Sequence, residues 1–120
     1  KQGNARGNKT IHYKNFRLDS NWELLLAKHL DLNSVEWIQP DAVVWIDQNG
    51  KKHKYFPDFY LPKYKVYLDP KNPICILQQK EKLKIVSKQL NLIYGDINFI
   101  INEVNKMAGL PGLEPRMNRP

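Results

Sequence analysis

Apolar residues recur at helical spacing in some stretches of this 120-residue chain, and they alternate with polar residues between those stretches. Helical spacing predicts a helix from Asp19-Ser20 to Asn33-Ser34, a long helix over 74–92 and a final helix over 97–108. Short alternating runs predict strands over 35–39, 42–47, 51–61, 63–68 and 92–94. Elements mixed in this way predict an α/β fold with a central mixed β-sheet flanked by helices, in the order α-β-β-β-β-α-β-α.

The two ends of the chain lack this periodicity. Residues 1–15 combine glycines, asparagines and basic side chains, so we expect a basic flexible arm or a linker from an upstream segment, since the chain begins at Lys1 rather than Met. Residues 109–120 hold two glycines and three prolines, and we expect a disordered tail. One folded domain over 16–108 is therefore predicted.

The chain is strongly basic, with a formal net charge of +7. This charge favours a polyanionic partner, and nucleic acid is favoured over an acidic membrane because the basic residues are dispersed along the chain. A solubilising surface is the alternative. No apolar run approaches the ~20 residues that a membrane span needs, so no membrane contact and an intracellular, cytoplasmic location are expected. The single cysteine, Cys75, excludes a disulfide framework within the chain and is expected to be a buried thiol.

Two acidic residues stand at or near the ends of aromatic and β-branched stretches within 55–61 and 66–71. If a hairpin joins these runs, Asp58 and Asp69 come close together, and two convergent carboxylates suit a hard divalent cation such as Mg²⁺. Lys71 stands two residues after the second acid and could hold a water molecule or stabilise a developing negative charge. Each acid also has a simpler explanation, as an edge-strand residue or as part of an Asp-Pro turn.

Glu23 has two interpretations that the sequence leaves open. Ser20 and Glu23 have the spacing of a capping box, in which the glutamate bonds back to the start of the helix. Glu23 could equally be a third acid that the helix directs towards Asp58 and Asp69. The histidines lack the spacing of a zinc site.

Basic residues flank the acidic run on both sides. We expect the leader and the Asn49-Gly50 hairpin to contact the phosphates of a nucleic acid, because both concentrate positive charge without an acidic partner nearby in sequence. The residues expected to make these contacts are Lys9, Lys14, Arg17, Lys51, Lys52 and Lys54.

Taken together, Pro57-Asp58, Asp69-Pro70-Lys71 and the helical acid Glu23 resemble the PD-(D/E)xK nuclease superfamily, whose members share a restriction-endonuclease-like core. Residues 12–24 and 49–59 resemble its phage- and intron-associated homing endonucleases, which are related to very-short-patch repair nucleases. The similarity extends over about residues 10 to 105.

This resemblance implies a Mg²⁺-dependent site, with Mn²⁺ as a possible substitute. Asp58, Asp69 and the Pro70 carbonyl would then bind the metal, Lys71 would position the attacking water, and Glu23 would act as a further catalytic acid. Asp69 stands where a glutamate is commoner in the superfamily.

The function that the resemblance implies is a metal-dependent DNA endonuclease of homing or mobile-element type. Two alternatives remain open at this point: a non-catalytic nucleic-acid-binding domain with a nuclease-like fold, and a transposase- or repair-associated nuclease subunit. The expected partner is DNA, with a possible upstream DNA-reading or zinc-binding module and a possible homodimer.

Overall fold

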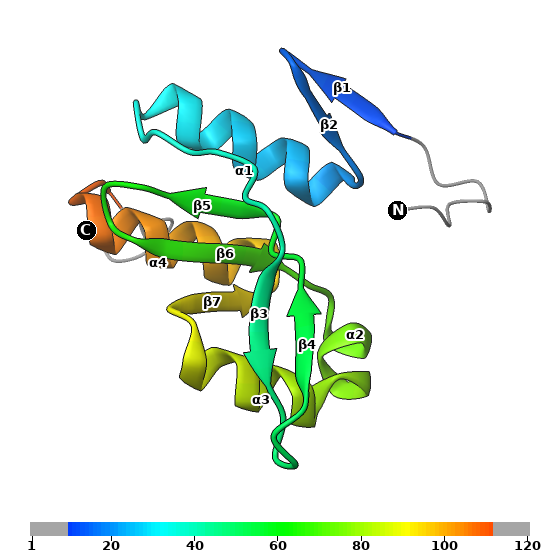
Figure 1. The fold of residues 1–120 in the computed structure, drawn as a ribbon. Helices are drawn as coiled ribbons and strands as arrows, with labels where there is room; N and C mark the ends of the chain where they lie inside the picture. Colours follow the sequence, from blue (N-terminus) through cyan, green and yellow to red (C-terminus); the bar gives the residue numbers. More distant parts are fainter. Residues whose placement is uncertain (1–9, 112–120) are drawn as a thin grey trace.

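Figure 1 shows the computed structural model of the chain, which describes residues 10–111. The elements are β1 (Ile11–Tyr13), β2 (Phe16–Leu18), α1 (Asn21–Leu32), β3 (Val43–Ile46), β4 (Lys52–Tyr55), β5 (Phe59–Leu61), β6 (Val66–Pro70), α2 (Pro73–Gln78), α3 (Lys80–Gln89), β7 (Leu92–Gly95) and α4 (Ile97–Ala108). The expected α/β class is therefore confirmed. Among the residues described, no helix has the length and apolar character needed to cross a bilayer.

The expectation of one central sheet is wrong, because the described strands form three small sheets. Strand β6 lies at the centre of a mixed sheet, antiparallel to β5 and parallel to β7, while β1–β2 and β3–β4 are separate antiparallel hairpins. The stretch 51–61, predicted as one strand, is divided at residues 56–58 between β4 and β5. Pro57 has no N–H to continue a ladder, so the chain leaves one sheet there and enters the next.

Two apolar clusters lie on opposite sides of the mixed sheet. Alternation along β6 directs Val66 and Leu68 into the larger cluster, with α1 and α4, and Tyr67 against the smaller one. The smaller cluster joins the β3–β4 hairpin to α3 through Trp45, Tyr55, Leu83, Val86 and Leu92. Figure 1 shows α1 and α3 on either side of the sheet, with the hairpin lying across α3. Asp69 shares the face of Tyr67 and so points towards the smaller cluster.

The first and last predicted helices are confirmed, and a side-chain cap starts each of them. Ser20 Oγ accepts a hydrogen bond from the Glu23 N–H at 3.2 Å at the start of α1, and Asp96 caps α4 in the same way through the Phe99 N–H at 2.8 Å. Gly109 ends α4 with φ +69°, a left-handed conformation that glycine adopts without a steric penalty.

The prediction of a single helix over 74–92 is wrong. The chain turns at Gln79, whose φ of −111° is not helical, and this residue separates α2 from α3. Helix α3 buries Leu83 and Val86 in the smaller cluster, whereas the side chains of α2 are exposed or half-buried. The change of direction lets α3 pack against the hairpin while α2 stays at the surface.

Of the remaining strand predictions, some are confirmed and others are wrong. The hairpin around Asn49-Gly50 is confirmed, with Gly50 at φ +82°, and so is the short strand that became β7. The predicted strand over 35–39 is wrong: Ile38 makes only an isolated bridge to Tyr60. The strand predicted over 63–68 starts later, at Val66, because residues 62–65 form the turn between β5 and β6.

Part of the expected flexible arm is ordered. Ile11–Tyr13 forms β1, and Ile11 and Tyr13 pack against the larger cluster, so the burial of these two side chains holds the segment in place. At the other end, the Leu110 N–H donates to the Asn105 carbonyl at 2.8 Å and completes the helix cap. The rest of both terminal predictions, over 1–9 and 112–120, lies outside the described residues.

Candidate active site

The β5–β6 hairpin brings the two predicted metal-binding acids together. Its register pairs Phe59 with Leu68, so one step further along the ladder places Asp58 opposite Asp69. Directly opposed residues point to the same face of a sheet, and the Asp58 and Asp69 side chains line the same cleft. Asp58 itself lies in a bend just before β5 rather than within the predicted strand.

Asp69 is buried, and two side chains satisfy one of its oxygens. The Tyr55 hydroxyl donates a hydrogen bond to Asp69 Oδ2, and Lys71 Nζ lies 3.4 Å from the same atom. Lys71 is held in turn through its main chain, because its N–H donates to the Gly95 carbonyl at 2.7 Å. A buried carboxylate needs such partners, and here they come from β4 and from the end of β6.

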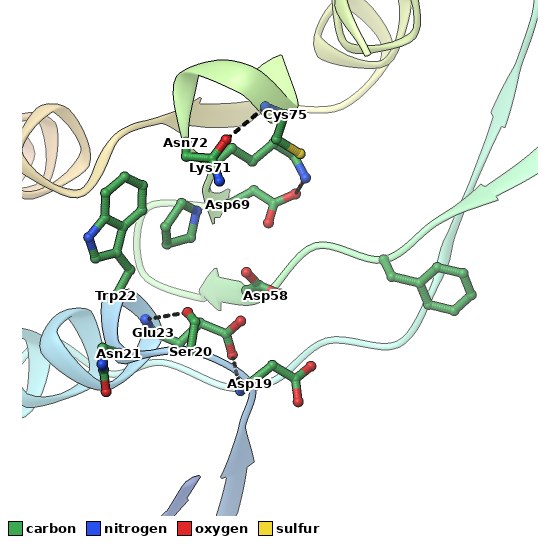
Figure 2. Close-up of a pocket in the computed structure, with 12 residues that line it drawn as sticks. Asp19, Ser20, Asn21, Trp22, Glu23, Asp58, Asp69, Lys71, Asn72 and Cys75 are labelled. Atoms are coloured by element: carbon green, nitrogen blue, oxygen red, sulfur yellow. Dashed lines mark hydrogen bonds and ion pairs between the residues drawn. The ribbon is translucent and has the colours of Figure 1, made fainter. Parts of the chain in front are cut away.

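Glu23 both caps the helix and faces the acids. The Asp19 N–H donates to Glu23 Oε1 at 3.0 Å, so the side chain bonds back to the residue before Ser20 rather than to Ser20 itself. The Glu23 side chain also lines the cleft with Asp58, and its charge raises the pKa of Asp58. Figure 2 shows Asp58 between Glu23 and Asp69. The two interpretations of Glu23 are therefore compatible, since one carboxyl group serves both the helix and the site.

The acids perturb one another strongly. Burial, followed by the charges of Asp69 and Glu23, raises the pKa of Asp58 from its ordinary 3.8 to about 10, and Lys71 opposes this rise. Burial also raises the pKa of Glu23. Because three carboxyl groups face one ammonium group, the metal-free site retains a proton, and a cation could take the place of that proton.

The acids open onto a cleft of about 440 Å³. Figure 2 shows its walls, which come from the start of α1, the 56–58 segment and the loop between β6 and α2. The Lys71 main chain faces β7, so the Pro70 carbonyl, one residue earlier, faces the β5 side of the strand. The extended register places Pro70 opposite Pro57, next to Asp58.

The donor atoms fit a hard divalent cation in their chemistry. Among residues 10–111, no group of three or more His, Cys, Asp or Glu side chains is arranged as a metal cluster. The candidate ligands are therefore two carboxylates, Asp58 and Asp69, with the Pro70 carbonyl beside them. Mg²⁺ is commonly held by one or two carboxylates, with water and substrate phosphate filling the other positions.

Two residues of the site were not anticipated from the sequence. Tyr55 contacts Asp69 directly; its position three residues before Asp58, at the start of an aromatic run, was the available signal. Burial and the Asp69 charge raise the pKa of Tyr55, so its hydroxyl keeps its proton.

The second residue is Cys75, for which the expectation of a buried thiol is wrong. This residue is half-buried in the cleft wall, and its Sγ accepts a hydrogen bond from Gln79 Nε2 at 3.3 Å.

The predicted phosphate-binding residues lie on two hairpins. Lys51, Lys52 and Lys54 are exposed on the β3–β4 hairpin, whose second strand leads to Tyr55 and the cleft. Arg17 is exposed on β2, and Lys9 lies outside the described residues.

Lys14, one of the leader residues expected to contact phosphate, has an acidic partner from a part of the chain that is distant in sequence. Its Nζ lies 3.0 Å from Asp31 Oδ2, and the Tyr13 hydroxyl donates to the same oxygen at 2.7 Å. Asp31 belongs to α1, so this ion pair joins elements that are distant in sequence. Part of the Lys14 charge is therefore already balanced within the protein.

Comparison with known proteins found no match: no family model, curated protein or solved structure corresponds to this chain. The function is therefore inferred from the geometry of the site. The features that bear on it are the Asp58–Asp69 pair, the adjacent Lys71 and the helical acid Glu23, which all line one cleft.

Proposed function

We propose that this protein is a metal-dependent endonuclease that hydrolyses DNA phosphodiester bonds with Mg²⁺ or Mn²⁺. The observation that carries the proposal is the convergence of Asp58, Asp69, Glu23 and Lys71 on one cleft of a basic chain. From α1 onwards the element order is α-β-β-β-β-α-α-β-α, which supports a restriction-endonuclease-like core.

In this proposal Asp58, Asp69 and the Pro70 carbonyl would hold the cation. The cation, when bound, supplies Lewis-acid stabilisation of a phosphate oxygen and a more acidic water. Lys71 presents an ammonium beside Asp69, where its N–H groups can donate to the attacking water and to a phosphate oxygen. Glu23 is next to Asp58, and its raised pKa makes it a better acceptor for the proton of that water.

The basic hairpin supplies the contacts that hold DNA over the cleft. Lys51, Lys52 and Lys54 donate to phosphates, and Arg17 extends the same kind of contact to β2. Such contacts carry no sequence information, so the choice of target would come from another module or from a second copy of the chain. This division of roles agrees with an endonuclease of homing or mobile-element type.

The direct test is cleavage of supercoiled plasmid by the purified chain. We expect nicked or linear DNA with Mg²⁺ or Mn²⁺, none with EDTA, and none from Asp69→Asn under any condition. Asp41→Asn is a matched control, because it removes the same charge from an exposed residue away from the cleft. DNA binding without metal-dependent cleavage would refute the catalytic assignment and leave a non-catalytic nucleic-acid-binding domain.

A further inference from the structure

Tyr55 connects the apolar interior to the acidic cleft. It ends β4, is only 3% exposed, and belongs to the smaller apolar cluster with Trp45 and Leu83. Its ring therefore has little freedom to move, while its hydroxyl reaches Asp69 Oδ2. A rigid aromatic body with one polar group at its tip can hold a carboxylate in a fixed direction.

Two ammonium groups also interact with the Tyr55 ring. Lys71 Nζ lies 5.8 Å from the ring centre and Lys82 Nζ lies 5.3 Å from it, both within the range of cation–π attraction. Lys71 follows β6, whereas Lys82 belongs to α3, so the ring joins α3 to the end of the strand that bears Asp69.

The hydrogen bond to Asp69 decides which part of this carboxylate remains for a cation. A carboxylate has two oxygens and about four lone-pair sites. Tyr55 and Lys71 both occupy Oδ2, which fixes the plane of the carboxylate. Asp69 Oδ1 has neither of these partners, and the extended hairpin register places Asp58 directly opposite Asp69.

We infer that Tyr55 is a positioning residue of the proposed metal site, which orients Asp69 so that its free lone pairs meet the ion that Asp58 also binds. This inference rests on the proposed function. Hydrogen-bond partners of metal ligands are commonly worth about 10- to 100-fold in metal affinity. Tyr55→Phe keeps the ring and its packing but removes the donor, so it should weaken metal binding by a factor in this range.

The experiment measures Mn²⁺ binding to the DNA-free protein by electron paramagnetic resonance, so that the readout does not depend on cleavage. We expect the Kd of Tyr55→Phe to rise about 10- to 100-fold. Tyr64→Phe is the matched control, because it removes a tyrosine hydroxyl from the β5–β6 turn, outside the cleft, and should leave the Kd unchanged. Circular dichroism of each variant reports whether the fold is kept.

A rescue variant separates positioning from packing. Tyr55→4-aminophenylalanine retains an N–H donor at the same place. Its Kd for Mn²⁺ should therefore stay within about threefold of the wild-type value, which is well below the tenfold change that a loss of ~1.4 kcal/mol would produce. If the wild-type chain shows no saturable Mn²⁺ binding, the proposed metal-dependent function is wrong, and the inference with it. If the wild type binds but Tyr55→Phe binds equally well, or if both Tyr55 variants lose affinity alike, only the role of Tyr55 is refuted.

Discussion

Replacing Asp58 by asparagine should stabilise the metal-free protein at neutral pH and remove its response to divalent cations. The folded-state pKa of Asp58 lies near 10, above its ordinary 3.8, because of burial and the neighbouring Asp69 and Glu23 charges. The folded chain therefore keeps a proton that the unfolded chain releases. The contribution of Asp58 to the free energy of unfolding is therefore fully present below the pKa of the unfolded state. It is lost as the pH rises towards the pKa of the folded state.

The size of the effect follows from the number of protons. One proton retained on folding changes the free energy of unfolding by about 1.4 kcal/mol per pH unit, or about 4 kcal/mol between pH 5 and pH 8. Asparagine has a similar shape and does not titrate, so the stability of Asp58→Asn relative to the wild type should rise across this interval. The contributions of other titrating groups cancel in the difference between the free energies of unfolding of the two proteins, except for groups that interact with Asp58.

The assay is urea unfolding at pH 5, 6, 7 and 8 in EDTA, followed by the fluorescence of the buried Trp37 and Trp45. At pH 8, Mn²⁺ at 100 times its Kd should stabilise the wild type by about 2.7 kcal/mol and leave Asp58→Asn unchanged. Asp41→Asn, at an exposed position, should follow the wild type throughout. A constant difference between wild type and Asp58→Asn at all four pH values would show that Asp58 is ionised in the metal-free fold, and the reasoning would fail.

Further predictions concern catalysis, binding and the fold. Lys71→Ala should lower the cleavage rate about 10²- to 10³-fold, because it removes a donor to the developing negative charge. DNA affinity, measured by fluorescence anisotropy, should change little. Comparable losses of cleavage rate and DNA affinity would show that Lys71 contributes to binding alone. Charge reversal of Lys51, Lys52 and Lys54 should weaken DNA binding and reduce the slope of log K against log salt by about 2.7, as expected for three lost phosphate contacts at ~0.9 each. An unchanged slope would remove the hairpin from the interface. Asp96→Ala should lower the free energy of unfolding by about 1 kcal/mol, measured in urea, because the Phe99 N–H at the start of α4 loses its cap. Stability equal to that of the wild type would show that the cap contributes nothing.

Local signals in the sequence were enough for the features that short segments determine. Ser20 marked the start of α1, and Asn49-Gly50 marked a hairpin, because a cap or a tight turn depends on a few neighbouring residues. The proximity of Asp58 and Asp69 also followed from the sequence, since a single hairpin register relates them.

Tertiary packing decided the features that depend on distant parts of the chain. The strand over 51–61 divides because its two halves pair with different strands, and the helix over 74–92 bends at Gln79 so that α3 can pack on the smaller cluster. Similarly, the hydroxyl of Tyr55 reaches Asp69 and the ammonium of Lys14 reaches Asp31 only in the folded chain. Propensity and spacing describe what a segment favours alone, whereas burial of apolar surface and pairing of polar groups across the fold decide where that segment ends and what its side chains contact.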